Sequence, residues 1–423
     1  MREAMRHLIA CVLMTCSSLA SATNGLNLIG YGAESSLMGG ADVAVARDAA
    51  ALNTNPAGLM QLRGPSLDIY GASSYALDVG HSDLIGNNLQ VDNKLINVAG
   101  FGYAKPLEDR RWVIGFGAFA QGGAGAVFKS MQTPFGTTDE LSSQFGAVRL
   151  TGGGAYRVDE ALSVGAAVSL LIGASKQQQF PHTSVITPAG PFFGSSLKDA
   201  TGHGFGFKLG AQYRLSPTLN LGASYTAKTR LPLKHGNLVV NMTAAGLGPV
   251  AYQDASIDGL AFPQTAALGF AWQSAPKLLW SFKYEWLDWS SAIRASTLTA
   301  TGPSNPAAPA TLTNSQILAW RDQHVIAAGM AYDYDQRTTL RAGFNYGRSP
   351  VPNERNNPIL NPIGEKHLTF GMSRKMEGGY TLHGGVEYQL PNTVYYNNPS
   401  LPFGPSSWRE ESIALHFMFS RRW

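Results

Sequence analysis

From residue 65 to the C-terminus, apolar and polar residues alternate within short segments that are separated by turns. This period of two is typical of a β-strand with one apolar and one polar face, and about ten residues make a tilted strand that crosses an outer membrane. An even number of antiparallel strands closes into a barrel that has no free edge. We predict about fourteen strands, at residues 65–78, 94–104, 111–121, 145–157, 161–172, 204–214, 218–228, 263–273, 277–287, 322–332, 337–347, 364–375, 379–390 and 411–422.

The connections between these strands alternate in length. Short connections occupy 105–110, 158–160, 215–217, 274–276, 333–336 and 376–378. Long connections, predicted as loops, occupy 79–93, 122–144, 173–203, 229–262, 288–321, 348–363 and 391–410. Outer-membrane barrels have short periplasmic turns and long external loops, so both chain ends are expected on the periplasmic side. A soluble sandwich has no reason to alternate so strictly.

The alternation also assigns residues to the two faces of the wall. In strand 277–287, Trp280, Phe282 and Tyr284 share one face, while Lys283 and Glu285 share the other. Polar positions of a membrane barrel face its lumen. The charged residues predicted to face the lumen are Arg149, Lys208, Lys283, Glu285, Arg341 and Glu387. Two interpretations stay open for them, namely a wet interior that contacts a plug, or contact with a ligand.

Residues 1–22 have the pattern of a Sec-type signal peptide, with a basic start, an apolar centre and the small-residue cleavage site Ala20-Ser21-Ala22. A lipoprotein signal at 13–16 is the weaker alternative, because Met and Thr suit it poorly. Both cysteines of the chain, Cys11 and Cys16, lie in this segment. The mature chain is therefore expected to have no disulfide and no cysteine metal site.

Residues 23–64 lack the strand-like alternation. The Ala-rich stretch Ala41–Leu52 predicts a helix that ends at Asn53. Asn55 is placed to cap a second short helix, with Pro56 at its first position, where a missing N–H costs nothing. A compact segment of this kind ahead of an all-β body predicts a plug, or hatch, inside a barrel formed by residues 65–423.

These residues also resemble a known family. Gly39-Gly40-Ala41, Asp48-Ala49 and the motif Asn55-Pro56-Ala57-Gly58 are similar to the hatch of the FadL/TodX-type outer-membrane transporters of long-chain fatty acids and other hydrophobic compounds. Residues 262–289 and 320–350 resemble strands of the same family. The resemblance implies passive transport across the outer membrane of a Gram-negative bacterium, through movement of the hatch and a side exit in the wall. We place that exit at a kink near Gly115, Gly117, Gly122 and Gly123; close packing of the hatch is the alternative.

Further partners follow from this interpretation. We expect a hydrophobic small molecule, lipopolysaccharide and other outer-membrane lipids, and the outer-membrane assembly machinery, which would read a last strand ending in Trp423. We expect a monomer. If the substrate carries a carboxylate, Arg341 is the preferred contact, because Glu285 is placed to neutralise Lys283; Lys208 and Arg149 are further choices.

Composition and motifs narrow the function. Charged residues make up 14% of the chain and the net charge is +4, without a basic run, which argues against nucleic acid. Because the sequence has no recognisable catalytic motif, we predict neither an enzyme nor a cofactor or metal site; a lipase-like set around His383 or His416 is the weak exception. The alternatives in function are a general porin, and an adhesin or phage-receptor barrel without transport.

Overall fold

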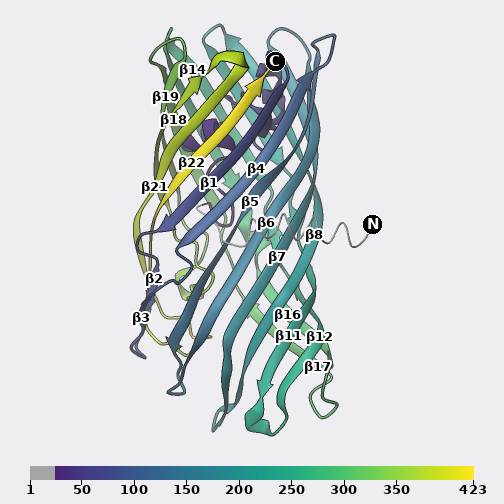
Figure 1. Cartoon of the computed structure of the whole chain (residues 1–423), viewed down its shortest axis with the longest axis vertical. Helices are drawn as coiled ribbons and strands as arrows, with labels where there is room; N and C mark the ends of the chain where they lie inside the picture. The colour runs from purple at the N-terminus through teal and green to yellow at the C-terminus, as the bar shows by residue number, and fades with distance from the viewer. Residues whose placement is uncertain (1–23) are drawn as a thin grey trace.

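A computed structural model describes residues 24–423, whose strands form a closed antiparallel barrel (Figure 1). The predicted signal peptide, residues 1–22, lies outside the described residues. The first and last wall strands pair from Ser66↔Arg422 to Ala76↔Ser412 and close the barrel. In wall order the strands are β1 (Ser66–Ala76), β4 (Leu95–Pro106), β5 (Trp112–Gln132), β6 (Thr138–Arg157), β7 (Leu162–Thr187), β8 (Gly190–Ser216), β9 (Leu219–Thr226), β14 (Thr265–Ala275), β15 (Leu278–Leu287), β18 (Gln323–Asp333), β19 (Thr338–Gly347), β20 (Lys366–Lys375), β21 (Tyr380–Tyr396) and β22 (Ser406–Arg422).

The fourteen wall strands confirm the predicted number and order of strands. The prediction ended several strands too early, because β5 to β8 continue as paired strands well beyond the span of a membrane. Figure 1 shows these strands extending toward the end of the barrel that carries the long connections. The loops predicted at 79–93, 229–262 and 288–321 are wrong in part, because residues 229–262 contain four strands and each of the other two regions contains two.

The additional strands enlarge the wall on the external side. β11 pairs with the outer part of β8, and the sheet continues through β12 and β16 to β17. Inside this extension the apolar side chains form a core that includes Leu197, Tyr252 and Trp320. The added strands are β2 (Gly80–Ser82), β3 (Asn88–Gln90), β10 (Thr229–Arg230), β11 (Leu233–Met242), β12 (Gly248–Asp258), β13 (Ala261–Phe262), β16 (Ala295–Pro303) and β17 (Thr311–Ile317).

The two faces of the wall carry the residues that the alternation assigned to them. Phe205 is 77% exposed and Phe370 is 61% exposed, although both are large apolar residues. Lys283 and Arg341 are buried, although both are charged. A barrel that is apolar outside and polar inside fits a surrounding lipid bilayer and a polar lumen.

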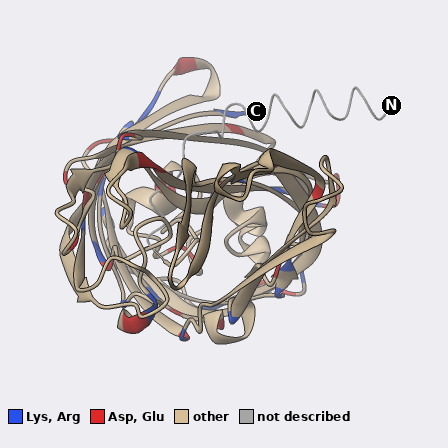
Figure 2. Cartoon of the chain, turned by 90° about the horizontal axis from the view of Figure 1, so that it is seen from below, with Lys and Arg blue, Asp and Glu red and all other residues tan. Residues whose placement is uncertain are grey.

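The hatch, defined here as residues 24–64, lies within the lumen, and coils of chain are seen inside the ring when the barrel is viewed from its external end (Figure 2). Its helices are α2 (Gly32–Leu37) and the 3₁₀-helices η1 (Ala49–Leu52) and η2 (Pro56–Gln61). The helix predicted over Ala41–Leu52 is wrong, because only its last four residues are helical. The propensity of alanine for helix is a weak preference, and docking of an extended chain against the wall overrides it here.

Glycines of the wall make room for the hatch backbone. A Cβ atom added at Gly222 would lie 2.3 Å from the Val43 carbonyl oxygen, and one at Gly343 would lie 2.2 Å from the Gly39 nitrogen. Real Cβ contacts are longer, so any side chain at these positions would displace the hatch. A Cβ added at Gly102, Gly165 or Gly329 would also meet the hatch, and one at Gly210 or Gly371 would meet the hatch side chains of Asn55 and Leu37.

Short helices complete the secondary structure. They are α3 (Trp289–Ala292), η3 (Thr243–Ala245), η4 (Asn353–Arg355) and η5 (Glu377–Gly379). In the described part of the chain, no helix has the length and apolar character needed to cross a membrane.

Candidate functional site

A buried ion pair holds the first helix of the hatch to the wall. Arg341 of β19 donates from Nη2 to Glu34 Oε1 at 3.0 Å, and its other guanidinium branch donates to Ser373 Oγ at 2.8 Å. The Glu34 carboxylate is also held by Arg47, which lies within the hatch and donates from Nε at 3.2 Å. Burial alone would raise the pKa of Glu34, but the two guanidiniums outweigh it and hold that pKa far below its ordinary value.

A second ionic contact lies at the middle of the hatch. Lys283 Nζ of β15 is 3.1 Å from Asp42 Oδ1 and 3.3 Å from Glu285 Oε2. Ser35 of the hatch donates to the other Asp42 oxygen at 2.6 Å. Glu285 therefore does partner Lys283, as the spacing of the two residues suggested, and the hatch supplies a further carboxylate.

The Asn-Pro-Ala motif links the last helix of the hatch to the wall. The Asn55 side-chain oxygen accepts a hydrogen bond from the Ala57 nitrogen, which caps η2 as predicted. Its amide nitrogen lies 2.7 Å from the Val43 carbonyl oxygen and 3.2 Å from the carbonyl oxygens of Ala211 and Ala223. Asn55 is thus both a helix cap and a cross-link between the hatch and strands β8 and β9.

Two carboxyl groups meet where η1, the first 3₁₀-helix of the hatch, begins. Asp48 accepts from the Ala50 nitrogen at 2.9 Å, and Asp68 of β1 accepts from the neighbouring Ala49 nitrogen at 2.9 Å. Burial raises the pKa of Asp48, and the negative charges of Asp68 and Glu34 raise it further. This junction therefore favours a protonated Asp48, in contrast to the strongly ionised Glu34.

Three of the predicted ligand-binding cations surround one small cavity. Arg149, Lys208 and Lys283 line a space of about 50 Å³ between the hatch and the wall. Arg149 donates to Gln121 Oε1 and to Ser169 Oγ, both at 2.9 Å, and Lys208 Nζ lies 3.2 Å from the Thr54 carbonyl oxygen. Arg341 does not line this cavity, because it is engaged with Glu34. Ligand binding by the four cations stays a prediction, and each of them lies at or near the hatch.

The wall is interrupted between β4 and β5. The ladder between them ends at Gly100↔Phe119, and contact resumes only where the Asp92 nitrogen donates to the Val127 carbonyl oxygen at 2.8 Å. Between those points, within the described chain, residues 95–99 pair with β1 and residues 120–126 pair with β6, but the two runs do not pair with each other. A side passage through the wall would need an interruption of this kind.

Gly122 and Gly123 lie within this interruption. A β-bulge falls between Ala120 and Gly122, and Gly122 has φ +142°, which L side chains rarely adopt. Asn27 of the hatch forms an isolated bridge with Gly122, so the hatch touches the bulged strand directly. Gly115 and Gly117 lie lower in the regular ladder, opposite Ala104 and Gly102. Gly122 thus lies both at a bulge and against the hatch, and the side exit near it stays a prediction.

A second small cavity opens beside the interruption. It holds about 40 Å³ and is lined by Ile29 of the hatch, by Ile96 and Val98 of β4, and by Glu387 and His416 on the other side. His416 Nε2 is 3.0 Å from Glu387 Oε2, and His367 Nδ1 is 3.1 Å from Glu387 Oε1. The Tyr70 hydroxyl lies 3.4 Å from His416 Nδ1, so this arrangement gives the lumen a polar lining.

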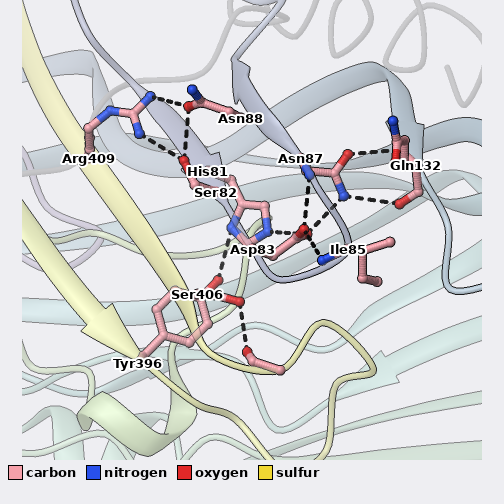
Figure 3. Close-up of polar contacts among 11 residues, drawn as sticks. His81, Ser82, Asp83, Ile85, Asn87, Asn88, Gln132, Tyr396, Ser406 and Arg409 are labelled. Atoms are coloured by element: carbon pink, nitrogen blue, oxygen red, sulfur yellow. Dashed lines mark hydrogen bonds and ion pairs between the residues drawn. The ribbon is translucent and has the colours of Figure 1, made fainter.

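On the external side, a polar cluster fastens the β2–β3 hairpin over the barrel (Figure 3). His81 Nε2 is 2.9 Å from Asp83 Oδ2, and His81 Nδ1 is 3.2 Å from the Tyr396 hydroxyl. Asn87 extends the cluster to the Gln132 carbonyl oxygen. Burial lowers the pKa of His81, so the neutral ring is favoured. The first external hairpin is thereby tied to β5 and β21 above an apolar cluster that contains Phe128 and Trp408.

Sequence reasoning missed the hatch side of these contacts. Glu34 and Asp42 lie among small residues without periodicity, and only their rarity as charges in the hatch could have indicated buried partners. Gln121, which binds Arg149 and the Tyr31 hydroxyl, gave no signal in the sequence.

Comparison with known proteins identifies a matching family and several relatives of this chain. A family model described as outer membrane protein transport protein (OMPP1/FadL/TodX) matches residues 16–401. The long-chain fatty acid transport protein of Escherichia coli K12 is 23% identical over 414 residues, covering 88% of each chain. Outer membrane protein P1 of Haemophilus influenzae is 22% identical over 288 residues, covering 62% of this chain and 59% of that protein.

Solved structures share the fold. The toluene transporter TodX of Pseudomonas putida superimposes with a TM-score of 0.78 at 20% identity, covering 94% of this chain and 99% of that chain. The toluene transporter TbuX of Ralstonia pickettii gives a TM-score of 0.74 at 21% identity, with the same coverage. A FadL homologue of Pseudomonas aeruginosa gives 0.74 at 17% identity, covering 94% of this chain and 98% of that chain.

Proposed function

This chain belongs to the OMPP1/FadL/TodX family of outer-membrane transport proteins, and from that premise we propose that it carries long-chain fatty acids or similar hydrophobic molecules across the outer membrane. Members of the family are passive transporters of hydrophobic compounds rather than enzymes. The proposed route enters from the external end, continues past a displaced hatch, and leaves sideways through the interruption between β4 and β5.

The observation that carries this proposal is the combination of a filled lumen and an interrupted wall. The cavities beside the hatch hold only about 50 and 40 Å³, which is too little for a fatty acid or an aromatic hydrocarbon. A substrate therefore needs the hatch to move. The unpaired runs at 95–99 and 120–126 start about seven residues above the periplasmic turn, so they face the lipid bilayer rather than the periplasm.

The ties between hatch and wall support a plug that can be displaced. The main ties are ion pairs and hydrogen bonds, at Arg341–Glu34, Lys283–Asp42 and Asn55. Polar contacts of this kind exchange readily with water once a local opening admits it. A general porin would need an open lumen, which the hatch fills, and an adhesin would need no interruption in its wall.

The charges beside the cavity favour an anionic head group over a neutral hydrocarbon. Lys283 and Arg341 already bind hatch carboxylates, so displacement of the hatch would free both for a substrate carboxylate. Arg149 has hydrogen bonds but no carboxylate partner among the described residues, and it lines the cavity. We assign Arg149 as the first contact of a carboxylate, with Lys208 and Lys283 beside it and Arg341 reached later.

Flux into liposomes tests the proposal. Protein reconstituted into liposomes should admit a long-chain fatty acid faster than its uncharged alcohol, and Arg149→Met should remove that preference. Gly123→Val should block entry of both, because a β-branched residue straightens or fills the bulged stretch and its Cβ approaches β6 rather than the hatch, whereas Gly152→Val is the control because nothing lies within 4 Å of that Cβ. Equal flux for empty liposomes and wild-type protein, or unchanged flux in Gly123→Val, contradicts the route.

The self-closing wall supports a monomer as the transporting unit, since β1–β22 pairing leaves no open edge in the membrane. The last strand, which precedes Trp423, is also proposed as the segment that the assembly machinery recognises.

A further inference from the structure

The outward face of β7 marks where the membrane ends. Its outward residues are apolar from Val164 through Val168 to Ala174, and the next two, Lys176 and Gln178, are polar. Ten residue steps span about 33 Å of strand, or about 25 Å of height at a tilt of about 40°, which is the thickness of an outer-membrane apolar band. Lys176 therefore lies at the level of the external head groups.

A groove follows this level across the outside of the wall. Gly125↔Gln144 and Gln144↔Lys176 are ladder partners, as are Val127↔Ser142 and Ser142↔Gln178, so these side chains share one face. That face points outward, because their neighbours Phe128 and Leu141 are buried in the apolar cluster within the barrel. The groove has a volume of about 520 Å³.

Three lysines line the groove without an ionic partner. Lys129, Lys176 and Lys198 come from β5, β7 and β8, all three are exposed, and none has an ion pair within residues 24–423. Carboxylates also line the groove, and two of them accept hydrogen bonds from groups other than the lysine ammonium groups. Asp92 accepts from the Lys129 backbone nitrogen at 2.8 Å, and Glu140 accepts from Ser142 Oγ at 2.7 Å.

The carboxylates do not suggest a bound cation instead. Asp92, Glu140 and Asp199 lie on separate segments, and among the described residues no three acidic or histidine side chains are placed to hold a metal ion. The free ammonium groups are thus the groups in the groove that are available to an anion. Clustered basic residues at a membrane surface bind anionic head groups.

We infer that this groove binds the phosphorylated head group of a glycolipid in the outer leaflet, which in an outer membrane is lipopolysaccharide. Lys129, Lys176 and Lys198 contact its phosphates, while its acyl chains lie along the apolar face below, over Val168 and Phe205. The groove includes Asp92 and Val127, which close the upper end of the interruption between β4 and β5. A lipid held there is a fixed neighbour of the proposed side exit.

Binding of purified lipopolysaccharide to the full-length mature protein in detergent tests this site. The triple variant Lys129→Gln, Lys176→Gln and Lys198→Gln should lose at least tenfold in affinity, because each lysine near an anionic surface contributes several-fold. The matched control changes three exposed lysines at the periplasmic end to glutamine, namely Lys105, Lys277 and Lys375, and should change affinity less than twofold. Heat-modifiable mobility on gels checks that both variants fold.

Three probes distinguish the sources of the signal. Wild-type protein should bind intact lipopolysaccharide more tightly than the phosphatase-treated form, and the difference should shrink as salt rises. Inorganic phosphate alone should bind weakly. Equal binding of the two lipid forms, an unchanged triple variant, or phosphate binding as tight as that of the lipid would overturn the assignment. Loss of binding on chelation of divalent cations would also overturn it, because it would place a metal bridge between the protein and the lipid.

Discussion

Replacing Arg341 with methionine should loosen the hatch without unfolding the barrel. Arg341 and Glu34 have side chains only 6% and 9% exposed, and their closest atoms are 3.0 Å apart. Removing one member of a buried ion pair costs about 3–5 kcal/mol, because the other charge loses its partner. Arg47 still holds Glu34 in this variant, but the Arg47 side chain is 41% exposed, so its contribution is partly screened by water.

We therefore expect hatch docking to weaken by about 2–3 kcal/mol, which increases the open fraction by roughly 30- to 150-fold. Hydrogen exchange measured by mass spectrometry should show lower protection factors in residues 32–47 and unchanged protection in the wall strands. Planar bilayers should show more frequent openings of the channel.

A second substitution separates the effect of charge from the effect of packing. Glu34→Gln removes the carboxylate that has lost its Arg341 partner, so the double variant Arg341→Met, Glu34→Gln should recover about half or more of the lost docking energy. Arg374→Met, at an exposed position on β20, is the control and should leave hatch exchange unchanged. Equal protection in wild type and Arg341→Met, or strictly additive effects in the double variant, would refute the argument that this pair holds the hatch.

Three further predictions concern the hatch. Deleting residues 24–63 should turn a low, selective flux into large ion conductance in planar bilayers, and unchanged conductance of a folded barrel would contradict the plug. Asn55→Ala should weaken docking by about 2–3 kcal/mol in hydrogen exchange, through loss of the cap and of bonds to buried carbonyl groups, whereas Asn397→Ala at an exposed position should have no effect. Because burial and Asp68 raise the pKa of Asp48 in the folded state, the contribution of Asp48 to docking should be largest below its unfolded-state pKa and should be lost as pH rises through its folded-state pKa. Asp48→Asn should flatten this dependence of the protection factors on pH, and an unchanged slope would rule out Asp48 as its source.

The wall could be predicted from the sequence because its signals are local. A period of two, an outward aromatic face and a strict alternation of connection lengths each depend on neighbouring residues only, and they located all of the wall strands. The outer halves of β5 to β8 were not found, since there both faces contact protein or water and the apolar alternation weakens. The hairpins β11–β12 and β16–β17 were not predicted for the same reason, because their apolar alternation is weak.

The contacts of the site depend on information that the sequence pattern does not contain. The alternation of the two strand faces placed Lys283 and Arg341 in the lumen. It could not show that each of them contacts a different carboxylate of the hatch. Their heights are set by the shear of the barrel and by the path of an irregular chain, and both are non-local. The Ala41–Leu52 prediction failed for a related reason, because a short Ala-rich helix is marginal in isolation and the wall offered a better set of contacts.

The composition of the hatch fits a plug that has to leave its site. About half of its buried apolar residues are alanines, such as Ala44, Ala49 and Ala57, and each of these buries little apolar surface. Glycines on the wall bring the two backbones close, so the fit is tight although the apolar area per residue is small. Polar ties at Glu34, Asp42 and Asn55 add to the packing of the larger buried side chains, such as Leu37 and Leu52. A leucine exposed on opening loses about 1.5–3 kcal/mol, an alanine loses less, and ion pairs and hydrogen bonds are largely replaced by water. The same sequence features that obscure the helices of the hatch therefore lower the barrier to its displacement.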